Sequence, residues 1–159
     1  LGALGQRKEF WKKKAEELES KLAKLGEKNL GLFFKSVSNF AKPIQASLNP
    51  DDTIQAAVRI MLQGVRRIPV VKDKKVVGTL TSIDIVGSLA DMITSDKIKQ
   101  VQHYMTEPVT IELDKNLIEA AKLMYEKNIS GLWVVNKKEK LVGALSQADL
   151  VRAIASLTR

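Results

Sequence analysis

Apolar and polar residues follow one another along the chain with a period that changes from element to element. Residues 53–63 place apolar side chains three and four positions apart, which predicts an amphipathic helix. Residues 67–71 and 75–80 are short apolar runs separated by the polar segment KDKK, a pattern that predicts a β-hairpin. Residues 82–92 return to helical spacing, and residues 44–48, which follow a proline, are short and extended. The predicted order of elements is therefore β-α-β-β-α.

The same order occurs a second time. VSNFAKPI parallels QHYMTEPV at a shift of 65 residues, and TIQAAVRI parallels LIEAAKLM at a shift of 64. Two copies of one unit explain the match, with single-residue insertions between elements. We therefore predict an α/β (α+β) protein of two β-α-β-β-α domains, at 36–95 and 96–159, preceded by an N-terminal segment of residues 1–35. The elements predicted for the second domain are 109–113, 117–127, 132–135, 140–145 and 147–157.

Each domain contains the motif Gly-x-x-Thr/Ser-x-x-Asp, which reads GTLTSID at residues 78–84 and GALSQAD at residues 143–149. The glycine permits a turn or the close approach of a ligand. The hydroxyl, at the end of a strand, can donate or accept a hydrogen bond. The carboxylate, at the start of the next helix, has acceptor oxygens that suit a vicinal diol such as that of ribose. The residues concerned are Thr81 and Asp84 in the first copy and Ser146 and Asp149 in the second.

Helix capping is the alternative role for these hydroxyls and carboxylates. A capping side chain stabilises a helix by roughly 0.5–2 kcal/mol without any ligand. Capping and binding are compatible, because a carboxylate has spare acceptor sites. Asp52 and Asn116, which are equivalent at the shift of 64, are the predicted N-caps of the first helix in each domain.

The repeated unit resembles the CBS domain, the regulatory module named after cystathionine β-synthase. The resemblance covers residues 36–159 and rests on the Ala-Ala helix, the apolar-Pro-Val-Val strand at residues 68–71 and the Gly-x-x-Thr/Ser-x-x-Asp ending. It implies a tandem pair that packs through its sheets into one pseudo-symmetric body. Trp133 stands where the first domain has Pro69, a departure that bears on the shape of the neighbouring cleft.

The resemblance also implies a ligand. CBS pairs hold an adenine nucleotide or a related adenosyl ligand in the clefts between their repeats, so AMP, ADP, ATP or S-adenosylmethionine is expected, and no cofactor. Asp84 and Asp149 would bind ribose, with Thr81 and Ser146 beside the sugar and phosphates. Contacts to the base would come from the residues after each proline, namely Ile44, Gln45, Ala46, Val109, Thr110 and Ile111.

The two implied clefts are chemically unequal. The resemblance places Val65, Arg66 and Arg67 opposite Asp149, and guanidinium groups suit phosphate. It places Ile129, Ser130 and Gly131, which offer only neutral groups, opposite Asp84. The Asp149 cleft is therefore expected to bind phosphorylated ligands more strongly. The alternative for the two arginines is a solvated strand end.

The N-terminal segment differs in pattern and in charge. Residues 1–42 hold ten Lys/Arg against five Asp/Glu and so carry most of the formal net charge of +8. This excess predicts an anionic partner, either nucleic acid or a membrane surface, and the alternative is a solvated helix face. A helix with a short heptad seam is predicted, which would pack on the two domains or on a second copy. The seam residues are Trp11, Ala15, Leu18, Leu22 and Leu25, with Gly26 as the helix end and Leu32, Phe33 and Phe34 as apolar anchors.

Catalytic and metal chemistry is not indicated. The chain has no cysteine and a single histidine, His103, which argues against disulfides, zinc sites and the familiar catalytic triads. It has no GxxxxGK[ST] loop and no apolar run near the about 20 residues that cross a bilayer. We expect a cytoplasmic protein that is not an enzyme and has neither a metal site nor a membrane span.

Three functions are compatible with these patterns. The first is a ligand sensor that binds an adenosyl ligand and acts on a partner, most simply as a homodimer. The second is a nucleic-acid-binding protein that uses the basic surface, although an aromatic content of 5% offers few stacking platforms. The third is a purely structural dimerisation module, against which stands the intact state of both motifs. A steep loss of affinity with salt would distinguish the second function.

Overall fold

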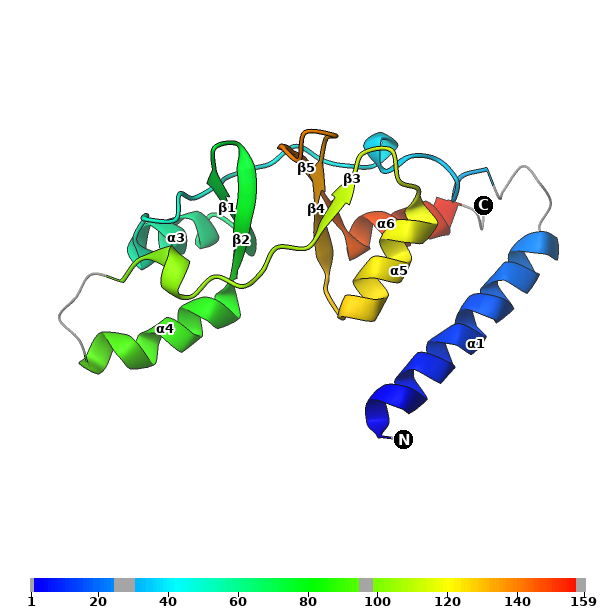
Figure 1. The fold of residues 1–159 in the computed structure, drawn as a ribbon, viewed down its shortest axis with the longest axis horizontal. Helices are drawn as coiled ribbons and strands as arrows, with labels where there is room; N and C mark the ends of the chain where they lie inside the picture. Colours follow the sequence, from blue (N-terminus) through cyan, green and yellow to red (C-terminus); the bar gives the residue numbers. More distant parts are fainter. Residues whose placement is uncertain (1, 25–30, 95–98, 157–159) are drawn as a thin grey trace. The chain divides into compact units, whose positions relative to one another are not determined.

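The computed structural model describes residues 2–24, 31–94 and 99–156, which form a mixed α+β structure (Figure 1). Each predicted helix and hairpin of the two repeats is present, in the predicted order. No helix in the described ranges is long and apolar enough to cross a bilayer. The elements are α1 (Ala3–Lys24), the 3₁₀ turn η1 (Val37–Asn39), α3 (Ile54–Met61), β1 (Arg67–Lys72), β2 (Lys75–Thr81), α4 (Ser82–Thr94), the 3₁₀ turn η2 (Val101–His103), β3 (Thr110–Glu112), α5 (Leu117–Lys127), β4 (Gly131–Val135), β5 (Leu141–Ser146) and α6 (Gln147–Ala155).

Both repeats build their sheets in the same way. β1 pairs with β2 in an antiparallel hairpin, whose two-residue turn places Asp73 and Lys74 at positive φ. In the second repeat β3 runs parallel to β4, and β5 follows as the third strand. The predicted strand at residues 44–48 is reduced to one parallel bridge between Leu48 and Val70, which is the counterpart of the β3–β4 pairing.

One of the two predicted N-caps is wrong. Asn116 caps α5 as predicted, and Glu119 completes a capping box with it. In the first repeat the cap is Thr53, whose hydroxyl accepts from the Ala56 N–H at 3.1 Å. The carboxylate of Asp52 instead accepts from the Asn49 N–H, because it lies in the turn that precedes the helix.

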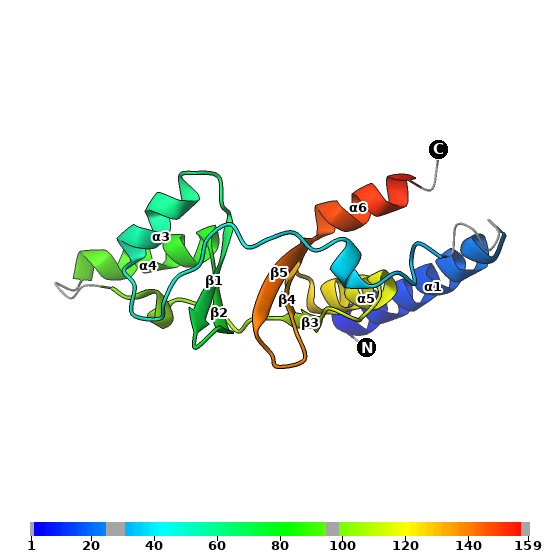
Figure 2. The same cartoon turned by 90° about the horizontal axis from the view of Figure 1, so that it is seen from above.

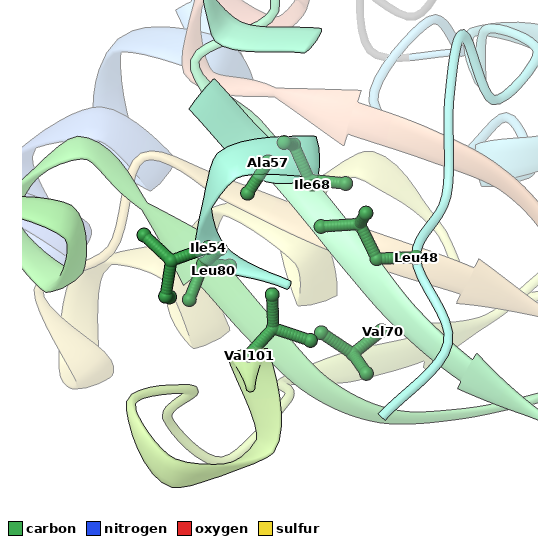
Figure 3. Packing of buried hydrophobic residues seen from close by; sticks show 7 residues of the cluster. All are labelled: Leu48, Ile54, Ala57, Ile68, Val70, Leu80 and Val101. Atoms are coloured by element: carbon green, nitrogen blue, oxygen red, sulfur yellow. The ribbon is translucent and has the colours of Figure 1, made fainter. Parts of the chain in front are cut away.

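The chain divides into two compact units. The sheet unit comprises Ala41–Leu113 and Leu132–Leu145, and the helical unit comprises Leu1–Phe40, Asp114–Gly131 and Ser146–Arg159. In the sheet unit, one face of the β1–β2 hairpin packs on α3 and on the segment at η2 (Figure 3). Side chains alternate across a strand, so Ile68, Val70 and Leu80 enter this core while Arg67 and Thr79 belong to the other face. The fully or nearly buried members of the core are Leu48, Ile54, Ala57, Ile68, Val70, Leu80 and Val101.

In the helical unit, α1 contacts the C-terminal half of α5. Arg7 donates to the side-chain oxygen of Asn128 at 2.9 Å, and the ring of Trp11 lies against that of Tyr125. The N-terminal helix therefore packs on the second repeat, one of the two predicted arrangements. Of the predicted anchors, Phe33 is buried, whereas Phe34 is 63% exposed. The seam residue Leu25, the predicted helix end Gly26 and the side chain of the seam residue Leu22 lie outside the described residues.

Within the sheet unit, each repeat sends an extended segment across the hairpin of the other. Lys42 pairs with Ala144 on β5, and Thr106 pairs with Thr79 on β2. The motif glycines lie at these crossings. A Cβ on Gly143 would stand 2.9 Å from the Lys42 carbonyl oxygen, and one on Gly78 would overlap the Met105 side chain. Neither glycine has a positive φ, so the close approach that requires glycine here is that of a crossing chain segment.

Candidate functional site

The first motif holds its carboxylate at the junction of β2 and α4. The backbone N–H and the hydroxyl of Thr81 donate to Oδ2 of Asp84, at 2.7 and 3.0 Å. Asp84 is partly exposed in the first turn of the helix. Oδ1 accepts no hydrogen bond from the residues that the structure describes, so this oxygen can accept from a ligand without any rearrangement of Thr81.

The second motif is built in the same way at the junction of β5 and α6. The N–H and hydroxyl of Ser146 donate to Oδ2 of Asp149 at 2.8 and 2.9 Å, and the Asp149 N–H returns a 3.3 Å bond to the hydroxyl. This is a capping box. Arg152 Nη2 lies 3.2 Å from Oδ1 of Asp149, which is itself 8% exposed. Asp149 therefore takes part in helix capping, and both carboxylates are fixed in orientation by the hydroxyl residue three positions before them.

Arg152 is a site residue that the sequence interpretation missed. It follows Asp149 by three positions, a spacing that brings side chains together on one helix face, so the signal was present. Its side chain is 62% exposed, whereas that of Asp149 is 6% exposed, so the ion pair joins a solvent-exposed guanidinium to a buried carboxylate. A ligand hydroxyl that replaced Arg152 at Oδ1 would have to supply the hydrogen bond that this buried oxygen loses, while the other donors of the Arg152 guanidinium can turn to a ligand anion.

The two arginines before the Pro-Val-Val strand differ in environment. Arg66 is exposed. Arg67 is half-buried, lies directly opposite Thr81 in the hairpin, and places its guanidinium 5.2 Å from the centre of the Trp133 ring. Burial lowers the pKa of Arg67 from its usual value, but a guanidinium remains charged at neutral pH. Arg66 is thus solvated, as the alternative interpretation of the two arginines expects, whereas Arg67 is not fully solvated.

Trp133, the residue equivalent to Pro69 of the first repeat, is buried in the sheet unit. Its indole Nε1 donates to the Thr79 hydroxyl at 2.7 Å, and both residues are 4% exposed. Thr79 and Arg67 lie on the same face of the hairpin, since cross-strand partners and alternate residues project to one side. Trp133 therefore bonds to the first repeat through Thr79 and makes a cation–π contact with Arg67. Sequence reasoning missed Thr79, since a lone threonine in a strand gives no signal.

The predicted base-contacting and cleft residues are partly accessible. Gln45 and Thr110 are exposed, whereas Ile111 and Gly131 are buried. The carbonyl oxygen of Ser130 accepts from the Gln147 N–H at 2.8 Å, which ties the segment before β4 to the start of α6. Ile44, Ala46, Val65, Val109 and Ile129 are partly buried.

The cross-repeat pairings stay predictions. Asp84 and the arginines belong to the sheet unit, while Asp149 and residues 129–131 belong to the helical unit. Among the described residues, no group of three or more His, Asp or Glu side chains is arranged to hold a metal ion.

Comparison with known proteins gives matches over most of the chain. The family model of the CBS domain matches residues 37–91 and again residues 98–156. A CBS domain-containing protein of Dictyostelium discoideum is 31% identical in an alignment 117 positions long, which covers 66% of this chain and 81% of that protein. The chain spans only 36–44% of the length of three uncharacterised relatives from Methanocaldococcus jannaschii.

Two crystal structures of CBS pairs are similar over their whole length. CBSX2, a CBS-pair protein from Arabidopsis thaliana, is 28% identical in its complex with AMP, with a TM-score of 0.68 over 79% of this chain and 99% of that one. The CBS domain pair of protein MJ0100, in complex with 5′-methylthioadenosine and S-adenosyl-L-methionine, is 25% identical, with a TM-score of 0.67 over 77% of this chain and 98% of that one.

Proposed function

The chain belongs to the CBS domain family, and we propose that it is a regulatory module that binds an adenosine-containing ligand and passes the bound state to a partner. The observation that carries this proposal is the pair of preorganised carboxylates. Thr81 and Ser146 hold Oδ2 of Asp84 and Asp149, so both carboxylates are fixed in orientation near the start of a helix, where a carboxylate can accept from a ligand diol. The ligands of the two similar CBS pairs all contain adenosine or a derivative of it.

The roles of the residues follow from their chemistry. Asp84 and Asp149 accept hydrogen bonds from the ribose hydroxyls, while Thr81 and Ser146 fix the carboxylates. Arg66, which is exposed, and Arg67, which is half-buried, supply charge-assisted hydrogen bonds to phosphate. The walls of the base sites are the segments after Pro43 and Pro108, with Val65, Ile129, Ser130 and Gly131 as further lining.

Phosphorylated ligands are the preferred class in this proposal. A guanidinium whose burial lowers its pKa has lost part of its hydration, so an anion that approaches it recovers interaction energy. AMP, ADP or ATP offers that anion, whereas S-adenosylmethionine carries a positive sulfonium and a carboxylate. We therefore rank the nucleotides above S-adenosylmethionine as the ligand of the arginine-bearing site.

The module is proposed to act as a cytoplasmic, non-enzymatic homodimer. Two helices expose apolar side chains on one face each, namely Ile83, Val86 and Leu89 on α4 and Val151 and Ile154 on α6. Apolar faces of this kind are buried when two copies associate. A bound ligand at the N-termini of α4 and α6 would then lie at the start of the dimer-forming helices, which gives binding a route to the partner.

A melting-temperature panel tests the proposal. AMP, ADP, ATP, GTP and S-adenosylmethionine are added separately to the purified chain, and an adenosine ligand at about a hundredfold its Kd should stabilise the fold by about 2.7 kcal/mol. The double variant Asp84→Asn/Asp149→Asn should lose the shift. The variant Lys137→Gln, in an exposed hairpin turn, is the matched control and should keep it. Absence of any shift at millimolar ligand, with no heat in titration calorimetry, would overturn the proposed function.

A further inference from the structure

The two motifs differ at the position three residues after their aspartate. Asp149 is followed at that spacing by Arg152, whereas Asp84 is followed by Gly87. The strand β5 leads directly into α6, so Asp149 lies in the first turn of this helix and Arg152 in the second (Figure 2). Side chains three positions apart are neighbours on a helix surface. The second motif therefore has a guanidinium beside its carboxylate, and the first motif has no side chain at the equivalent position.

The Asp149 carboxylate has donors from the chain on both of its oxygens. Oδ2 accepts from the N–H and the hydroxyl of Ser146, at 2.8 and 2.9 Å, and Oδ1 accepts from Nη2 of Arg152 at 3.2 Å. In the first motif, by contrast, the two bonds that Asp84 accepts from Thr81 both go to Oδ2. A ligand diol at Asp149 therefore has to share Oδ1 with the arginine or replace it there, and it does so next to a positive charge.

The guanidinium of Arg152 can bind a second group of the same ligand. The Arg152 side chain is 62% exposed while that of Asp149 is 6% exposed, so the guanidinium extends from a buried carboxylate into solvent. A guanidinium has five N–H donors, and the bond to Oδ1 uses one of them. Charge-assisted bonds from this planar group suit the oxygens of a phosphate or a carboxylate. A ligand that joins a diol to an anionic group can therefore be bound by both partners of the ion pair.

From this arrangement we propose that Arg152 determines the ligand class of the Asp149 site, so that the site prefers a ribose that carries an anionic group, such as a phosphate, to a neutral nucleoside. In the proposed function, on which this role rests, Asp149 accepts hydrogen bonds from the ribose hydroxyls. With a phosphorylated ligand, the guanidinium donates to the phosphate and stays beside the carboxylate. With a neutral nucleoside, the guanidinium gains no new partner, while the sugar hydroxyls compete with it for Oδ1.

A purely structural ion pair is the competing role for Arg152. A pair at this spacing stabilises a helix weakly, and it would also help to orient the Asp149 carboxylate. Loss of such a pair would change the affinity for every ligand of the site by the same factor, because each of them uses the same carboxylate. The two roles therefore differ in the ratio of the affinities for AMP and for adenosine, which share the sugar and the base and differ only in the phosphate.

Titration calorimetry on the full chain measures this ratio. All variants carry Asp84→Asn, so that the Asp149 site is the one observed. Arg152→Gln should weaken the binding of AMP about tenfold or more, which is the effect of losing a hydrogen bond between charged groups, and should leave the binding of adenosine unchanged or tighter. Arg152→Lys retains a positive charge and should retain part of the preference for AMP. The matched control Arg59→Gln removes the same charge from an exposed position on α3 and should change neither affinity.

A transplant of the arginine into the first motif is the second test. An added Cβ at Gly87 has nothing within 4 Å, so Gly87→Arg can be accommodated in α4. In an Asp149→Asn background, Gly87→Arg should raise the affinity of the Asp84 site for AMP relative to adenosine. The melting temperature of each variant without ligand establishes that the fold is kept.

The ratio of the two affinities decides between the roles of Arg152. An equal loss for AMP and adenosine on Arg152→Gln, or no loss for either, would overturn the role in ligand selection and leave Arg152 a structural residue, with the proposed function intact. An unchanged ratio on Gly87→Arg would contradict selection by a guanidinium at this position. A parent chain that binds neither ligand would instead overturn the proposed function, and the role of Arg152 with it.

Discussion

The indole N–H of Trp133 donates to the hydroxyl of Thr79 at 2.7 Å, and this buried bond joins the sheet of one repeat to that of the other. The equivalent residues of the other repeat cannot form this bond. The residue equivalent to Trp133 is Pro69, and the residue equivalent to Thr79 is Ala144. The Arg67 guanidinium also lies over the ring of this tryptophan. Because the first repeat has a proline at the equivalent position, the two repeats differ in the contacts that they make at their interface.

The first prediction concerns this bond. Trp133→Phe keeps an aromatic ring but leaves the Thr79 hydroxyl without its donor, and Thr79→Val leaves the indole N–H unpaired. Each should lower the free energy of unfolding by about 1–3 kcal/mol, the cost of an unsatisfied buried group. The double variant should lose less than the sum of the two, because both partners of the bond are then absent. Urea unfolding followed by circular dichroism measures all three, and strictly additive losses would contradict the coupling.

A second prediction compares three glycines. Gly143→Ala should destabilise strongly, since its Cβ would meet the backbone carbonyl of Lys42 at 2.9 Å and a strand crossing cannot move aside. Gly78→Ala should cost less, because its Cβ meets the flexible side chain of Met105. Gly87, inside α4, has nothing within 4 Å of an added Cβ, so Gly87→Ala should stabilise by about 0.5–1 kcal/mol through helix propensity. The melting temperatures of the three variants measure their relative stability. A Gly143→Ala variant as stable as the parent would contradict the close packing of the Lys42 segment on Gly143.

The contacts of the motif glycines also show which features could not be predicted from the sequence. Repetition and periodicity predicted the elements of both repeats, because helices and hairpins leave local signals. The motif glycines were explained by turns or ligands, since the residues that require them are distant in the chain: Met105 is 27 positions from Gly78 (105 − 78), and Lys42 is 101 positions from Gly143 (143 − 42). The Trp133–Thr79 bond was missed for the same reason: its partners are 54 positions apart and carry no local pattern. The prediction that Asp52 caps the first helix was wrong because Asp52 and its neighbour Thr53 are both good N-cap residues. The backbone conformation determines which of the two is the cap.

A third prediction addresses assembly. Val86 is 63% exposed on α4, between Ile83 and Leu89 on one helix face, and a charge placed there would oppose burial of that face. We expect the parent chain to behave as a dimer of twice 17.6 kDa and Val86→Arg to shift it toward monomer. Val77→Arg, at a position on β2 that is 37% exposed, is the control and should leave the dimer intact. Multi-angle light scattering decides, and a parent that is monomeric at every concentration would refute the assembly.

The last prediction ranks the two motif carboxylates. Loss of a hydrogen bond to a charged group costs roughly 1.5–3 kcal/mol, so Asp149→Ala should weaken AMP binding about tenfold or more. Asp84→Ala should have the smaller effect, because the resemblance to CBS pairs places Arg66 and Arg67 at the Asp149 site. The double variant Arg66→Ala/Arg67→Ala should weaken the binding of AMP more than that of adenosine, because adenosine has no phosphate for the arginines to contact. Asp149 also belongs to the capping box of α6, so a melting temperature of Asp149→Ala close to that of the parent is required before the affinities are compared. Titration calorimetry measures each affinity. If Asp84→Ala abolishes AMP binding while Asp149→Ala leaves it unchanged, the arginines serve the carboxylate of their own hairpin, where Arg67 lies opposite Thr81, and the predicted pairing is inverted.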